Sequence, residues 1–150
     1  MTDLTAQIQK LWEQGQLPIL NGILLAEGTY YAVNHNVPET TEIDITAQNS
    51  KFDPEYDFSC INILVATEYN GHNIYCGDGS FGGDGFVIVL DGSGKISWLF
   101  MHEQANPFVN MQIDGHRLEI QNNCLVTWRF NLLNPLEMSV DLTTGIGYKP

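Results

Sequence analysis

The sequence has few basic residues: six Lys and Arg stand against eighteen Asp and Glu in 150 residues, for a formal net charge of −12. A small domain needs a net charge of only about 2 to 8 to stay in solution. A surface this negative repels nucleic acid and attracts basic partners. The shortage of positive charge therefore argues against direct nucleic-acid binding and predicts a basic protein as the partner.

Cysteines, long apolar runs and a secretory signal are also scarce or missing. The chain has three cysteines, Cys60, Cys76 and Cys124. Their odd number and unpaired spacing favour free thiols in a reducing compartment. No stretch reaches the roughly 18 apolar residues that a membrane span needs. The first residues lack the basic and apolar regions of a signal peptide. We therefore expect a cytoplasmic protein without a membrane partner.

The length and composition predict one domain over residues 1–150. A chain of this size can bury roughly two thirds of its unfolded surface, and 43% of its residues are hydrophobic. Residues 3–15 form the one segment with helical periodicity, with Leu4, Ile8, Leu11 and Trp12 on a single stripe. Gly15 provides the stop signal. We expect one amphipathic helix there and β structure over residues 19–142.

The rest of the chain alternates with period two. The segments 41–46, 58–69, 86–90, 95–100, 124–130 and 136–142 have the composition and patterning of strands. Asn70-Gly71 is a strong hairpin signal, and Asp114-Gly115 suits a type I′ turn between residues 111–113 and 116–120. Asn134-Pro135 lies in a further turn. The predicted fold class is mainly β: an antiparallel meander, as a twisted sheet or a small sandwich, with the N-terminal helix packed on its edge or end.

Two local patterns resemble catalytic or ligand-binding motifs but are incomplete. The glycine-rich segment Gly77–Gly85 leads into a strand rather than a helix, so its amides do not form a phosphate loop. His72 and Cys76, with Asp78 nearby, could imitate a Cys-His pair or part of a zinc site. An acidic setting favours the thiol over the reactive thiolate, and no spacing supplies the remaining zinc ligands. We expect no catalytic residues, no metal and no cofactor.

The tryptophans Trp12, Trp98 and Trp128 lie on faces with apolar periodicity. This position is typical of core residues, although tryptophan also provides stacking platforms for sugars. A carbohydrate-binding or other small-ligand β module therefore remains the alternative to a protein-binding function, and a small enzyme is the less favoured third possibility.

The acidic residues are concentrated where the strand pattern is weakest. Residues 34–91 contain a single base, Lys51, and residues 34–57 are the most irregular segment. Irregular segments carry binding residues more often than regular elements do. We predict that the partner binds to Glu39, Glu42, Asp44, Asp53, Glu55 and Asp57, with Asp78 and Asp84 as secondary candidates.

Residues 82–138 contain a run of features that recur in a known class of proteins. They are a Gly-Gly-Asp-Gly-Phe strand start, a hairpin ending at Trp98, an Asn-Pro-Phe turn, and Asn-Asn before a second hairpin containing Trp128. This stretch resembles the small acidic β-rich immunity proteins that bacteria encode beside polymorphic or contact-dependent toxins. The resemblance implies a protein that binds and neutralises a basic toxin, such as a nuclease domain. These families are diverse, so it assigns no role to an individual residue.

Overall fold

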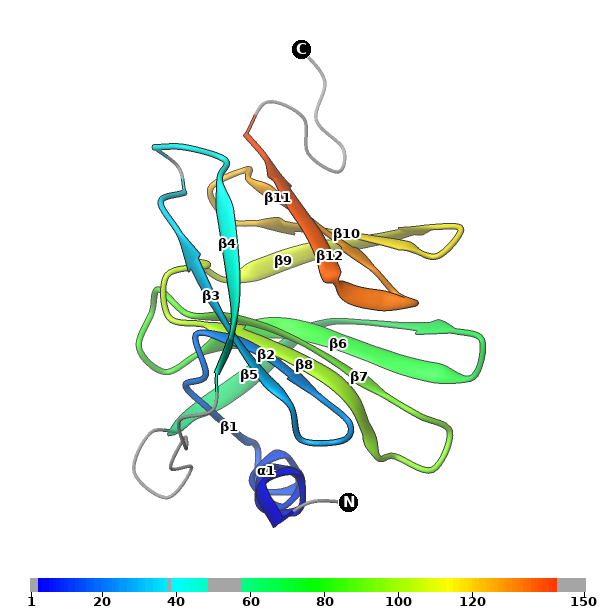
Figure 1. Ribbon diagram of the computed structural model, residues 1–150. Helices are drawn as coiled ribbons and strands as arrows, with labels where there is room; N and C mark the ends of the chain where they lie inside the picture. Colours follow the sequence, from blue (N-terminus) through cyan, green and yellow to red (C-terminus); the bar gives the residue numbers. More distant parts are fainter. Residues whose placement is uncertain (1–2, 38, 49–57, 143–150) are drawn as a thin grey trace.

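The computed structural model describes residues 3–37, 39–48 and 58–142, which form one helix and twelve strands (Figure 1). The prediction of a mainly β protein with an N-terminal helix is confirmed. The elements are α1 (Asp3–Glu13), β1 (Gln16–Pro18), β2 (Gly22–Leu25), β3 (Tyr30–His35), β4 (Ile43–Gln48), β5 (Phe58–Tyr69), β6 (His72–Gly79), β7 (Gly85–Leu90), β8 (Ile96–His102), β9 (Phe108–Asp114), β10 (Arg117–Asn122), β11 (Thr127–Asn131) and β12 (Asn134–Asp141).

The strands form two antiparallel sheets. The larger sheet has the order β1-β5-β6-β7-β8-β2-β3-β4, and the smaller has the order β12-β11-β10-β9. Strands β5 to β8 and β9 to β12 are consecutive hairpins, whereas β2 joins β8 and so places the β3–β4 hairpin at one edge of the larger sheet. The smaller sheet covers one face of the larger (Figure 1). Helix α1 packs on the other face, against central strands, and not on an edge or end as predicted.

Strands β7 and β8 are the centre of the molecule because both of their faces are covered. Val87 and Val89 face the smaller sheet, while Phe86 and Ile88 face the helix side. All six residues of β7 are buried, as an apolar run without alternation predicts. Successive side chains of a strand point to opposite faces, so a strand that is apolar at every position must be covered twice.

Aromatic rings join the two sheets. The Phe100 ring of β8 lies 5.4 Å from the Trp128 ring and 5.3 Å from the Phe130 ring, both on β11, and Trp98 lies 5.4 Å from Phe130. Trp98 and Trp128 are buried, so their prediction as core residues is confirmed. Trp12 of α1 is half-buried, 5.6 Å from the Tyr75 ring.

Helix α1 depends on the sheet for its stability. Its 11 residues are fewer than the roughly 12 to 15 that an isolated helix needs in water. Ile8 is fully buried on the sheet, and the Gln9 amide donates to the Gly94 carbonyl at 2.9 Å and accepts from the Ile96 amide at 3.1 Å. The helix ends at Glu13, two residues earlier than predicted, before Gly15 at a φ of 75°. Among the described residues no helix has the length and apolarity to cross a membrane.

The two predicted asparagine-glycine and aspartate-glycine turns differ in outcome. Asn70 and Gly71 both have positive φ, as a type I′ turn requires. The prediction of a type I′ turn at Asp114-Gly115 is wrong by one residue. Asp114 pairs with Arg117, so the turn residues are Gly115 and His116. Of those two only Gly115 has positive φ, which is typical of a type II′ turn with glycine first.

A buried carboxylate ties the β6–β7 connection to β5. Asp84 is inaccessible to solvent, and it accepts hydrogen bonds from the Ser59 hydroxyl at 3.1 Å and from the Gly79 amide at 3.1 Å. The Ser59 hydroxyl also accepts from the Ser80 amide at 2.9 Å. A Cβ atom at position 79 would lie 2.0 Å from the Asp84 carboxylate, so glycine is required there. The glycine-rich segment therefore has a structural role: it holds the buried hydrogen bonds among Asp84, Ser59 and Gly79.

We predict that Asp84→Ala lowers the free energy of unfolding by about 2 to 3 kcal/mol, because it leaves buried donors without an acceptor. Urea denaturation measures the loss. Asp78→Ala is the control: Asp78 accepts from the exposed Asn62 amide at 3.0 Å, and its loss should cost less than about 1 kcal/mol. Equal losses in the two variants would contradict the role assigned to Asp84.

Candidate functional site

A groove of about 610 Å³ opens beside the β3–β4 hairpin at the edge of the larger sheet. We call it the acidic groove, because two carboxylates and no lysine or arginine occur among its lining residues. These are Asn34, His35, Asn36, Thr40, Glu42, Ile43, Asp44, His102 and Gln104.

The groove forms just before the first residue of β2, where this strand no longer separates β8 from β3. Gly22, the first residue of β2, pairs with Met101 of β8 on one side and with Ala32 of β3 on the other. It must be glycine, since a Cβ atom there would lie 2.1 Å from the Tyr31 carbonyl oxygen. Next to Gly22, the side chain of His102 on β8 forms a hydrogen bond with the Val33 carbonyl of β3 at 3.0 Å. β8 and β3 are thereby joined at the base of the groove.

His102 is held in one neutral form. Its Nε2 faces the Val33 carbonyl, which only accepts, so Nε2 carries the proton and donates it. Its Nδ1 accepts from the Gln104 amide at 3.1 Å and therefore has no proton. Burial, and then the charge of nearby His35, lowers the pKa of His102 to about 4, against the opposing effect of the bond to Val33. The side chain is uncharged at neutral pH.

His35 lies against His102 and completes the floor of the groove. The two imidazole centroids are 4.4 Å apart, and the Trp128 ring is perpendicular to His35 at 5.1 Å. The His35 Nδ1 accepts from the Val37 amide at 3.2 Å, while its buried Nε2 has no hydrogen-bond partner among the described residues. Burial lowers the pKa of His35 as well. The floor therefore provides no positive charge to offset the carboxylates above it.

The carboxylates lie at the rim of the groove. Glu42 and Asp44 are both exposed, Asp44 on β4 and Glu42 directly before it. The Glu42 amide donates to the Thr40 hydroxyl at 3.3 Å, which fixes the local turn. Alternate residues Ile43 and Ile45 pack against the core between the sheets. This alternation of apolar and acidic residues points the two acids away from the core.

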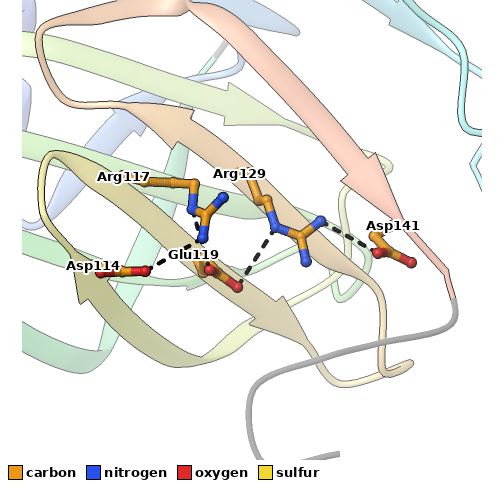
Figure 2. A network of polar contacts seen from close by, with 5 residues as sticks. All are labelled: Asp114, Arg117, Glu119, Arg129 and Asp141. Carbon is orange, nitrogen blue, oxygen red and sulfur yellow. Dashed lines mark hydrogen bonds and ion pairs between the residues drawn. The ribbon is translucent and has the colours of Figure 1, made fainter.

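The two arginines are held on the outer face of the smaller sheet (Figure 2). Arg117 Nη2 lies 3.4 Å from Asp114 Oδ2, and Arg117 Nε lies 3.4 Å from Glu119 Oε1. Arg129 Nε lies 3.6 Å from Glu119 Oε2, and Arg129 Nη1 lies 3.4 Å from Asp141 Oδ2. Three acids thus surround two bases, so adjacent carboxylates balance the positive charges of both guanidinium groups. They contribute no charge to the acidic groove.

The structure brings together only part of the predicted binding surface. Glu42 and Asp44 line the groove, and Glu39 is exposed in the preceding connection. Asp78 lies on β6, five strands from β4 in the sheet order. Asp84 is buried, so it is not part of the proposed surface. The predicted residues Asp53, Glu55 and Asp57 lie outside the described residues.

His72 and Cys76 do not form a pair. They are four residues apart on the same strand, a separation of about 13 Å at about 3.3 Å per residue. Cys76 is buried between the sheets, and burial raises the pKa of its thiol to about 12. Such a thiol is not ionised at neutral pH. Over residues 3–37, 39–48 and 58–142, no three His, Cys, Asp or Glu side chains converge as metal ligands.

Sequence reasoning missed the two histidines of the groove. They lie 67 residues apart in the chain and meet only because β2 begins at Gly22 and does not extend between them. No motif spacing could have paired them.

Comparisons with protein-family models, with curated proteins and with solved structures find no match to this chain.

The neutral histidine predicts a pH-dependent stability. An unfolded chain takes up a proton at His102 near pH 6.5, whereas the folded chain stays neutral until about pH 4. The stabilisation is complete above pH 6.5 and is lost as the pH falls toward 4. We expect the free energy of unfolding to fall by about 2 kcal/mol more between pH 7 and pH 5 in the wild type than in His102→Gln. Urea denaturation at each pH measures the difference, and parallel pH profiles would contradict it.

Proposed function

We propose that this protein binds a basic protein partner through the acidic groove and neutralises it, as an immunity protein does with its cognate toxin. The observation that carries the proposal is the groove itself, about 610 Å³ in volume, with Glu42 and Asp44 exposed at its rim. Its histidine floor is uncharged, and the arginines are paired elsewhere. A cationic side chain entering the groove would meet two carboxylates and no competing base from the described residues.

The class of partner follows from the charge. A domain that acts on nucleic acid must present lysines and arginines to the phosphates. An inhibitor with a net charge of −12 can occupy such a surface in place of the polyanion. The long-range field would also raise the association rate toward about 10⁸ to 10⁹ M⁻¹s⁻¹ at low salt. A nuclease toxin is therefore the partner that we propose.

The proposed action is binding without chemical turnover, in the cytoplasm of a bacterium. Cys76, the thiol with a histidine nearby in the sequence, is buried and un-ionised at neutral pH. Cys60 and Cys124 are exposed free thiols, which suits a reducing compartment.

Sugar binding has less support. Trp98 and Trp128 are buried in the core, and Trp12 packs against Tyr75 and Phe86. The rings of Trp98 and Trp128 are therefore not available to stack on a pyranose, and Trp12 is half-buried against its aromatic neighbours. We therefore put forward no second candidate.

The test titrates the wild type with purified basic nuclease-toxin domains, beginning with any that the neighbouring genes encode. Exchanging the rim acids, as in Glu42→Lys/Asp44→Lys, should weaken binding at least about tenfold, because attraction becomes repulsion. Wild-type affinity should also fall steeply with added NaCl, since exposed charges are screened. Isothermal titration calorimetry measures both effects.

A matched control separates the groove from the net charge. Glu13→Lys/Glu27→Lys makes the same change in charge at two exposed residues outside the groove. It should slow association slightly and leave the dissociation rate unchanged. Equal effects of the two double variants would remove the groove from the proposal. Absence of any basic toxin domain that binds the wild type would remove the proposal itself.

A further inference from the structure

Exposed apolar side chains gather around β5. Seven large hydrophobic residues are exposed among the described residues, and three of them lie on this one strand. Phe81 follows Ser80, whose hydroxyl lies 3.1 Å from that of Ser59 on β5, and Val109 belongs to β9, which packs on β5. Large apolar side chains that are exposed in one region often mark an interface. The members of this β5 patch are Phe58, Ile63, Leu64, Phe81 and Val109.

The outer edge of β5 is open over most of its length. β1 pairs with β5 only at Phe58, Ser59 and Cys60. From residue 62 to residue 69 the described part of the chain supplies no second neighbour. Tyr69 and His72 flank a two-residue turn and so form a hydrogen-bonded pair, and this pattern alternates along the hairpin. The backbone amides and carbonyls of Ala66 and Glu68 therefore point to the open edge.

This edge has little of the usual protection against another strand. Proteins guard sheet edges with lysine, proline, inward charges or bulges. β5 contains no lysine or proline, and Glu68 is its one charged residue. It has one bulge, between Ile63 and Val65. At the opposite edge of the same sheet, β4 carries Asp44 and is preceded by Glu42.

We propose that a second copy of this chain occupies the edge, with the two β5 strands antiparallel around a two-fold axis near Ala66. Two copies that each carry a net charge of −12 repel one another over most of their surfaces. Glu68 is the one charged side chain of β5, and around an axis at Ala66 it lies opposite Leu64 of the other copy, so the copies can approach there at the least electrostatic cost. A cationic partner gains little from a strand with a single charge. An antiparallel strand pair is also self-complementary, as a two-fold interface requires.

The dimer would leave the acidic groove free. β5 lies near one edge of the larger sheet, and the groove lies at the other edge, beside β4. The two interfaces also depend oppositely on salt. Screening should strengthen the dimer, because its charges only repel, whereas it should weaken binding in the groove.

Sedimentation velocity of the full chain tests the proposal. The wild type should have twice the 16.8 kDa mass of one chain, with a larger dimeric fraction at higher NaCl. Leu64→Glu and Ala66→Pro should both give monomers, because the first places a carboxylate opposite Glu68 of the other copy. Proline at position 66 removes an amide that faces outward, so the pairing with β6 is retained. Leu133→Glu is the matched control, because Leu133 is 71% exposed in the β11–β12 turn, and it should stay dimeric.

A wild type that is monomeric up to about 1 mM would overturn the proposal, and so would a dimer that Leu64→Glu leaves intact. Circular dichroism verifies that each variant is folded. If Ala66→Pro does not fold, Leu64→Glu decides, since Leu64 is already 48% exposed. Glu42→Lys/Asp44→Lys should remain dimeric, so this result is independent of the function of the groove. Hydrogen exchange at the Ala66 and Glu68 amides should slow as the protein concentration rises.

Discussion

The packing of β8 against β11 is the contact on which the rest of the structure depends. The Phe100 ring lies between Trp128 and Phe130, and all three side chains are almost completely buried. A sheet whose central strands are apolar on both faces is stable only when both faces are covered. The smaller sheet covers one face through these rings, and α1 covers the other through Ile8. Large-to-small changes at such aromatic positions cost about 3 to 5 kcal/mol.

The acidic groove is an extension of that core to the surface. His35 packs between Trp128 and His102, so the last aromatic of the inter-sheet layer is also the floor of the groove. Burial keeps both imidazoles neutral, and the arginines are compensated on the outer face of the smaller sheet. The negative field at β4 is therefore a consequence of packing. The two arginines are paired on the smaller sheet, and the two histidines beside the rim acids are uncharged at neutral pH.

Local patterns made much of the fold predictable. The strand at 58–69 has the predicted bounds, and the 86–90 strand is buried on both faces as expected, because these properties depend on nearby side chains. The short strands β1, β2 and β3 were not predicted individually, since their partners lie far away in the chain. The same limit explains the site: Glu42 and Asp44 follow from alternation, whereas His35 and His102 meet only through the strand order. Asp84 was predicted as a surface acid because nothing local indicates Ser59 beside it.

A chemical-shift titration of the full chain with an arginine-rich peptide tests most directly whether the groove is where positive charge binds. We expect the largest shifts at Asn34, Glu42, Asp44 and Gln104, and we expect them to disappear in high salt. Asp78 and the acids around Arg117 should shift little, because Asp78 lies elsewhere in the sheet and the other acids are already paired. Shifts spread evenly over all exposed carboxylates, or centred on the smaller sheet, would contradict binding in the acidic groove.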